Sequence, residues 1–438
     1  MTEPKIITLG CRLNAHESDT ASAHARAAGL ADSVIVNTCA VTTEAVRQAR
    51  QTIRRLKREK PEARIIVTGC AVQLNADRFA AMPEIDAVIG NREKLEAETF
   101  VAIARANDQF VRVGEIAKTR AVAVPPPPSF SQGRTRAILT VQNGCDHRCT
   151  FCIIPFARGP ARSMTAGEAV KCVRDFVAGG HREVVLTGVD LTSYGTDLKD
   201  RAPLGRLVRT ILREVPELPR LRLSSIDPAE VDNDLLQALA EEPRLMPYLH
   251  LSLQSGDDMV LKRMKRRHTR QGAIRFTEAL REARPDIVLG ADLIAGFPTE
   301  TDDMFQTTLD TIAACGLTYL HIFPYSARPG TPASRMPQVP GEIVVARAAR
   351  LRQEGRVRLE AFLRTEVGSV RTVLMERGGT GRTPQFAEVA VNAAPDAGAI
   401  MDVRIIGQDG TRLVGECVAA IGAPTRKRLG TQGIKVTV

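Results

Sequence analysis

Three cysteines stand close together in one short segment of the chain: Cys145, Cys149 and Cys152. Three thiolates from a single loop suit a cubane 4Fe–4S cluster in which one iron keeps no protein ligand. That open iron can bind the amino and carboxylate groups of S-adenosylmethionine (SAM) and deliver an electron that splits its sulfonium bond. The alternative is structural zinc, which usually takes four ligands from paired Cys-x-x-Cys segments. This single loop does not provide them, so the spacing favours a cluster.

A second set of three cysteines is dispersed along the first part of the chain: Cys11, Cys39 and Cys70. Each follows an apolar, strand-like run and has a glycine or a threonine directly before it. Because the carboxyl ends of parallel strands meet at one edge of a sheet, we expect the three thiols to converge on a second 4Fe–4S cluster. The alternative is three small buried residues at strand ends. The remaining cysteines are interpreted as packing residues: Cys172, Cys315 and Cys417.

Strand–helix alternation predicts the elements that hold both sets. Residues 1–124 are expected to form a doubly wound parallel α/β domain, with strands at Ile6–Leu9, Val34–Val36, Ile65–Val67 and Ala87–Ile89. Four consecutive prolines, Pro125–Pro128, indicate a stiff linker over residues 125–133. Residues 134–366 are expected to form a partial (β/α)6 barrel, with strands at Ile138–Val141, Glu183–Thr187, Arg220–Ser224, Leu249–Leu253, Val288–Leu293 and Leu320–Phe323.

The last part of the chain has a different pattern. A long charged helix is predicted over Ile343–Leu363. From residue 367 to residue 438, short β-rich runs are separated by glycines, which predicts a small antiparallel β-barrel. Its expected strands are Val370–Met375, Ala387–Val391, Met401–Ile406 and Arg412–Val418.

Functional groups of such parallel barrels lie at the carboxyl ends of the strands. Four residues at predicted strand ends are therefore candidates to bind SAM: Gly188, Ser224, Gln254 and Asp292. A purely structural role is an equal alternative for each of them. The sequence assigns no residue to proton transfer.

The chain carries a net charge of +10. Two basic runs, at residues 47–60 and 262–270, are typical either of solvated helix faces or of a surface for a polyanion such as RNA. Three arginines are candidate contacts to RNA phosphate: Arg158, Arg162 and Arg382. No apolar run is long enough to span a membrane and the first residues do not resemble a signal peptide, so we expect a cytoplasmic protein.

At these residues the sequence resembles the methylthiotransferase family of radical SAM enzymes over essentially its whole length. The segments that carry the resemblance are Gly10–Asn14, Asn37–Cys39, Thr68–Cys70 and Cys145–Cys152, together with Gly381–Thr383 and Phe386 near the end. The resemblance implies an N-terminal auxiliary-cluster domain, a radical SAM core and a C-terminal RNA-binding TRAM domain. It further implies two 4Fe–4S clusters, SAM as methyl donor and radical source, and a flavodoxin or ferredoxin as electron donor.

Within that family, the segment Asn143–Pro155 and its continuation to Ser163 most resemble the MtaB-like branch. That branch modifies C2 of N6-threonylcarbamoyladenosine in the anticodon loop of tRNA. The alternative branch, named MiaB, acts on N6-isopentenyladenosine in tRNA. A rival from outside the enzymes is an RNA-binding protein with structural zinc, which explains the charge and the β-rich tail but not two open cysteine triplets.

Overall fold

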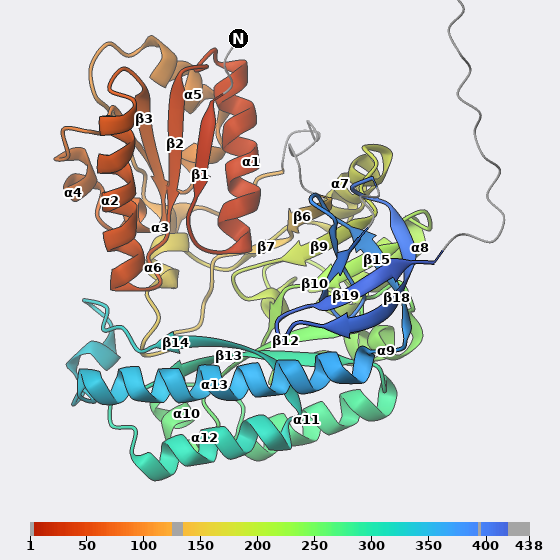
Figure 1. Ribbon diagram of the computed structural model, residues 1–438. Helices are drawn as coiled ribbons and strands as arrows, with labels where there is room; N and C mark the ends of the chain where they lie inside the picture. Colours follow the sequence, from red (N-terminus) through yellow and green to blue (C-terminus); the bar gives the residue numbers. More distant parts are fainter. Residues whose placement is uncertain (1–3, 125–134, 393–395, 419–438) are drawn as a thin grey trace, which may run out of the picture.

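In the computed structural model, which describes residues 4–124, 135–392 and 396–418, the chain forms three units (Figure 1). The predicted linker Pro125–Pro128 lies outside the described residues. No helix among the described residues combines the length and the apolar character needed to cross a lipid bilayer.

The first unit is a parallel five-stranded sheet in the order β1-β2-β3-β4-β5. Its strands are β1 (Lys5–Thr8), β2 (Ser33–Thr38), β3 (Arg64–Gly69), β4 (Ala87–Ile89) and β5 (Phe110–Arg112). Helices α1 (Arg12–Ala27) and α5 (Ala97–Arg105) pack on one face, and α2 (Thr43–Glu59), α3 (Cys70–Leu74) and α4 (Ala76–Ala80) belong to the other side. Helices on both faces confirm the layered parallel architecture. The strand order is consecutive, however, so the sheet lacks the reversal of a doubly wound fold.

The central unit is a partial parallel barrel made of two adjoining sheets, β10-β9-β6 and β11-β12-β13-β14. Its strands are β6 (Arg136–Thr140), β9 (Glu183–Thr187), β10 (Arg220–Leu223), β11 (Ser225–Ile226), β12 (Tyr248–Gln254), β13 (Val288–Ala295) and β14 (Leu317–Pro324). β10 and β11 are separated by Ser224 alone, so they count as one bent position. The strands then occupy the six predicted positions.

Helices cover the outside of this barrel and bury most of its apolar side chains in one continuous core. They are α7 (Ala166–Ala178), α8 (Leu204–Glu214), α9 (Asn233–Glu241), α10 (Asp258–Met264), α11 (Arg270–Ala283) and α12 (Asp302–Ala314). The long helix α13 (Gly341–Glu366) runs beneath β13 and β14 (Figure 1) and extends a few residues beyond its predicted bounds. A short antiparallel pair, β7 (Gln142–Asn143) with β8 (Arg162–Ser163), brackets the first cysteine loop and helix α6 (Ile154–Arg158).

The last unit is a closed five-stranded barrel in the order β15-β16-β17-β19-β18. Its strands are β15 (Val370–Met375), β16 (Thr380–Arg382), β17 (Glu388–Val391), β18 (Ile400–Gln408) and β19 (Leu413–Cys417). All neighbouring pairs are antiparallel except β17 with β19, and Leu363 from α13 completes the barrel core. The prediction of a small, mainly antiparallel barrel is confirmed, although β16 was not expected.

Candidate metal centres

The first cysteine loop leaves the barrel directly after β7, at Gly144. The backbone there has φ of +74°, and a Cβ atom on this residue would lie 1.8 Å from the carbonyl oxygen of Pro160. Only glycine fits this turn. The amide of Cys145 then donates to Gly159 O at 3.1 Å, and the amide of Thr150 donates to Met264 O at 3.1 Å. The loop is thereby fixed at both ends before any cofactor binds.

The three thiols of this loop lie close enough for the charge of one to affect the pKa of another. Burial, together with the charge of the neighbouring Cys149, raises the pKa of Cys152 to about 12. Burial likewise raises the pKa of Cys145 well above its ordinary value, with further increases from Asp190 and the other two cysteines. Sulfur atoms in this condition become thiolates only when a cation shares their charge. The donor set therefore fits an iron–sulfur cluster.

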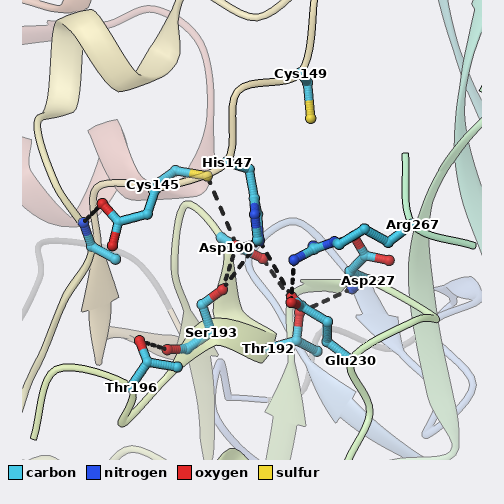
Figure 2. Close-up of polar contacts among 12 residues, drawn as sticks. Cys145, His147, Cys149, Asp190, Thr192, Ser193, Thr196, Asp227, Glu230 and Arg267 are labelled. Carbon is cyan, nitrogen blue, oxygen red and sulfur yellow. Dashed lines mark hydrogen bonds and ion pairs between the residues drawn. The ribbon is translucent and has the colours of Figure 1, made fainter. Parts of the chain in front are cut away.

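Charged side chains surround the loop (Figure 2). His147 Nε2 lies 2.7 Å from Asp190 Oδ2 and 3.4 Å from Glu230 Oε2. The hydrogen bond to Asp190, followed by the one to Glu230, raises the pKa of His147 to about 9. Cys145 Sγ is within donor distance of the same Asp190 oxygen, at 3.8 Å. The imidazolium thus orients Asp190 beside the first cysteine, an arrangement that the sequence analysis did not predict.

Two arginines of the second basic run lie beside this loop. Arg266 donates to Asp227 Oδ2 at 2.9 Å and lies 3.9 Å from Cys149 Sγ through a second nitrogen. Arg267 donates to the same Asp227 oxygen at 3.0 Å. The charge of Arg266 is therefore used inside the protein, where it faces a predicted cluster ligand, and for this residue the interpretation as an exposed RNA surface is wrong. Arg267 is 36% exposed, so its contact with RNA stays a prediction.

Three of the four SAM candidates lie at strand ends as predicted. A Cβ atom at Gly188, directly after β9, would lie 2.8 Å from Gln142 Oε1, so a larger residue there would have to displace the Gln142 side chain. Ser224 is buried and its hydroxyl makes no hydrogen bond within the described residues. Gln254 ends β12 with φ of +70°.

The strand-end setting predicted for Asp292 is wrong. Asp292 lies in the middle of β13, and its carboxylate contacts His250 Nε2 at 2.9 Å and His321 Nδ1 at 3.4 Å. Burial would raise the pKa of Asp292, but the two histidines lower it to about 2. The tighter of these two partners, His250, also contacts the Tyr248 hydroxyl at 2.9 Å. Asp292 therefore belongs to a hydrogen-bonded chain inside the barrel, away from the strand ends.

The second set of cysteines converges as the strand ends predicted. Cys11, Cys39 and Cys70 follow β1, β2 and β3, which are consecutive neighbours in the sheet. A Cβ atom on Gly10 would lie 3.0 Å from Cys39 Sγ, so glycine permits the close approach of the two loops. Burial, together with the charges of the other two thiols, raises the pKa of Cys39 to about 11.

A buried network of charges adjoins Cys70. Arg158, on α6 of the central unit, donates from Nε to Cys70 Sγ at 3.2 Å and from its terminal nitrogens to Glu17. Lys94 Nζ lies 2.5 Å from the same Glu17 carboxylate. The Glu17 and Arg158 side chains are 2% exposed and that of Lys94 is fully buried. Two cations thus face one carboxylate, and the surplus positive charge suits an anionic sulfur site at Cys70.

These contacts correct two of the RNA predictions. The guanidinium groups of Arg158 and Arg162 are buried, and Arg162 donates to the carbonyl oxygens of Ala121 at 3.0 Å and Pro160 at 3.0 Å. Neither side chain has a surface to offer to a phosphate. Arg382 is about one quarter exposed and pairs with Glu388 at 2.7 Å, so its contact with RNA stays a prediction.

Two family models match the chain. Residues 139–312 match the radical SAM superfamily, and residues 4–90 match a family described as uncharacterized protein family UPF0004. Among solved structures, the radical SAM methyltransferase TsrM from Kitasatospora setae superposes with a TM-score of 0.52 over 74% of this chain and 68% of its own. At 19% identity, this likeness concerns the fold alone.

Relatives whose names state an activity match most of the chain. A threonylcarbamoyladenosine tRNA methylthiotransferase, MtaB, of Rickettsia prowazekii (strain Madrid E) is 46% identical over 92% of this chain and 94% of its own length. The protein of the same name in Bacillus subtilis (strain 168) is 36% identical over 75% and 74%. A tRNA-2-methylthio-N(6)-dimethylallyladenosine synthase of Cereibacter sphaeroides (strain ATCC 17029 / ATH 2.4.9) is 34% identical over 95% and 98%.

Proposed function

Because the chain belongs to the methylthiotransferase family of radical SAM enzymes, we propose that it transfers a methylthio group to C2 of N6-threonylcarbamoyladenosine beside the anticodon of tRNA. The observation that carries this proposal is the presence of two separate three-cysteine sites. In each of them one cysteine directly follows a glycine of positive φ, Gly10 or Gly144, at which a Cβ atom would crowd the neighbouring loop. A relative of nearly half-identical sequence and matching length bears the name of this activity.

The first site, Cys145, Cys149 and Cys152, is proposed to hold the radical SAM cluster, and Cys11, Cys39 and Cys70 the auxiliary cluster. When bound, the first cluster with SAM supplies a 5′-deoxyadenosyl radical and the second takes part in sulfur delivery. The protein's own groups prepare both sites. Gly188, Ser224 and Gln254 line the strand ends where SAM would lie, while Asp292 is held by its histidine partners.

RNA binding is proposed for surfaces at the two ends of the chain. The exposed side of α2 carries Arg47, Arg54 and Arg55, whose side chains are 57%, 50% and 61% exposed. The closed C-terminal barrel is proposed to be a TRAM-like RNA-binding domain that includes Arg382. An anticodon loop suits such an enzyme because its bases can be splayed out of the stack and offered to a site.

The remaining assignments follow from this function. The auxiliary-cluster domain covers residues 1–124, the linker 125–133, the radical SAM core 134–366 and the RNA-binding domain 367–438. A flavodoxin or ferredoxin is proposed as the electron donor, and the cytoplasm as the place of the reaction, because both the tRNA substrate and reduced thiols are found there.

The second candidate substrate is the dimethylallyl-type adenosine of tRNA. It is favoured by relatives named for that reaction, which are 34% identical over nearly the whole chain. It is ranked second because the 46% identical relative bears the other name.

Mass spectrometry of tRNA nucleosides tests the proposal. Cells that lack the gene are compared with cells complemented by the wild type or by Cys70→Ser. The methylthio group on threonylcarbamoyladenosine should disappear on deletion and return only with the wild type. Loss from the dimethylallyl nucleoside instead would move the protein to the second substrate. If every thiolated nucleoside is unchanged, the proposal of a tRNA substrate is wrong.

A further inference from the structure

Four arginines surround a single aromatic ring where the three units of the chain meet. The ring is that of Phe386, which lies between β16 and β17 of the C-terminal barrel. Guanidinium carbons lie 4.9–5.4 Å from its centroid, and they belong to Arg12 of the first unit, Arg136 and Arg222 of the central barrel, and Arg382 of the C-terminal barrel. Tyr248 stacks on the same ring with centroids 5.3 Å apart.

Three of these arginines are neutralised by carboxylates. Arg222 donates to both oxygens of Glu183, at 2.8 and 3.2 Å. Arg136 lies 2.8 Å from Glu376. Arg382 donates to its own glutamate partner, as described above. Of these three pairs, the one between Arg136 and Glu376 links the central barrel to the C-terminal barrel, and each of the three arginines has a carboxylate within ion-pair distance.

Arg12 is different. Within the part of the chain that the structure describes, its guanidinium makes no hydrogen bond and no ion pair, and its ring contact with Phe386 is at 5.4 Å. Arg136 and Arg222 repel it, and Glu183 attracts it only across a distance that is too long for an ion pair. A largely desolvated cation beside other cations is unfavourable unless an anion joins it. Arg12, Arg136 and Phe386 are each only partly buried, so an anion can reach them from solvent.

The position of Arg12 relates this surplus charge to the reaction. It directly follows Cys11, a proposed ligand of the auxiliary cluster, so the two Cα atoms are about 3.8 Å apart. A nucleobase presented to that cluster through C2 would carry its N6 substituent nearby. In threonylcarbamoyladenosine this substituent ends in a carboxylate, whereas the dimethylallyl group is apolar and uncharged.

We propose that Arg12 binds the threonyl carboxylate of the substrate and so distinguishes threonylcarbamoyladenosine from adenosines that carry an uncharged N6 group. The inference rests on the proposed function. The guanidinium offers two parallel N–H donors, a geometry that matches a carboxylate. The ring of Phe386 supports the plane of the guanidinium, as in a cation–π contact. An RNA phosphate offers the same oxyanion chemistry, and the experiment separates these two sources.

Equilibrium binding of anticodon stem-loop RNAs to the cluster-loaded protein provides the test. Three RNAs are compared: one with threonylcarbamoyladenosine, one with its threonyl methyl ester, and one with unmodified adenosine. The wild type is expected to prefer the first over the other two by roughly ten- to a hundredfold, the value of a charge-assisted hydrogen-bonded pair. Arg12→Gln should bind all three RNAs with similar affinity. Arg12→Lys should keep part of the preference, because it retains the charge without the fork.

Two controls accompany the measurement. Arg209→Gln removes an exposed arginine on the outer helix α8, whose partners are Gln237 and Glu241, and should leave the preference unchanged. Iron content and the visible spectrum should be the same in Arg12→Gln and the wild type, which shows that the variant is folded and loaded. The methyl ester arm needs no variant at all, so the inference remains testable if Arg12→Gln folds poorly.

The outcomes distinguish the inference from the function on which it rests. If the wild type modifies threonylcarbamoyladenosine in RNA but binds its ester equally well, the carboxylate is not recognised and the inference is overturned. The same conclusion follows if Arg12→Gln keeps the preference. If Arg12→Gln lowers the binding affinity for all three RNAs by the same factor, Arg12 contacts a phosphate instead. If the wild type modifies only the dimethylallyl nucleoside, the proposed function itself fails.

Discussion

Replacing Glu17 by glutamine removes the one carboxylate from the buried network beside Cys70 while keeping the shape of the side chain. Arg158 and Lys94 then remain as buried cations without their anion. Breaking a buried pair by removing one partner costs about 3–5 kcal/mol. The pKa shift of Glu17 gives a similar free energy. The two cations lower the pKa of Glu17 from 4.5 to about 2 against the effect of burial, which corresponds to about 3 kcal/mol of stabilisation.

The pH dependence of this stabilisation has a definite sign. The folded pKa of Glu17 is depressed, so its contribution is fully present above about 4.5 and is lost only as the pH falls toward 2. The loss of unfolding free energy in Glu17→Gln, relative to the wild type, should therefore be constant between about pH 8 and pH 5.5. A deficit that grows or vanishes within that window would have to come from another group.

The assay is urea-induced unfolding followed on the cluster-free protein, in which this network still joins the first unit to α6. A matched control is Glu44→Gln, which removes an exposed carboxylate paired with Arg47 on α2 and should change nothing measurable. A deficit below about 1 kcal/mol for Glu17→Gln, equal to that of the exposed control, would refute the reasoning. It would mean that water or a rearrangement already compensates the cations.

Three shorter predictions concern the cluster sites. Cys70→Ser should reduce the iron content from two clusters to one, and reductive cleavage of SAM should persist while methylthiolation stops; loss of both clusters would contradict two independent sites. Gly144→Ala should abolish the radical SAM cluster, since its Cβ atom would overlap a facing carbonyl oxygen at 1.8 Å, whereas Gly167→Ala, with open space around it, should load normally. His147→Gln should retain less iron than the wild type at pH 7. The difference in iron content should shrink as the pH rises through about 9, because the imidazolium, whose pKa is raised to about 9, then loses the charge that pairs with Asp190. A difference in iron content that stays the same across this pH range would contradict the prediction.

Much of the architecture could be predicted from local patterns. The strand-end cysteines were found because an apolar, strand-like run and the glycine or threonine that follows it are both visible in the sequence. Strand Val370–Met375 was located at its observed bounds for the same reason. Strand β16 was missed because three residues with a central glycine carry no alternation.

The site chemistry that was missed depends on contacts between distant parts of the chain. Arg158 follows the cysteine loop closely and resembles an exposed phosphate ligand, yet Glu17, its partner, lies 141 positions away. No local sequence pattern indicates that these two residues pair. Asp292 was placed at a strand end because the predicted strand stopped too early, and its two histidines come from neighbouring strands. Exposure and pairing are properties of the folded chain, so residue type alone could not supply them.

The position of α6 has a consequence for how such chains can be recombined. Cys152 and Arg158 belong to one short segment, so a piece of the central barrel contributes to the surroundings of Cys70 in the first unit. The unit of exchange between two related enzymes is therefore not the span before the proline linker. A chimera that takes residues 4–124 from another enzyme would have to bring Ile154–Arg158 with them. The residues around Cys70 thus come from two stretches of sequence on opposite sides of a domain boundary.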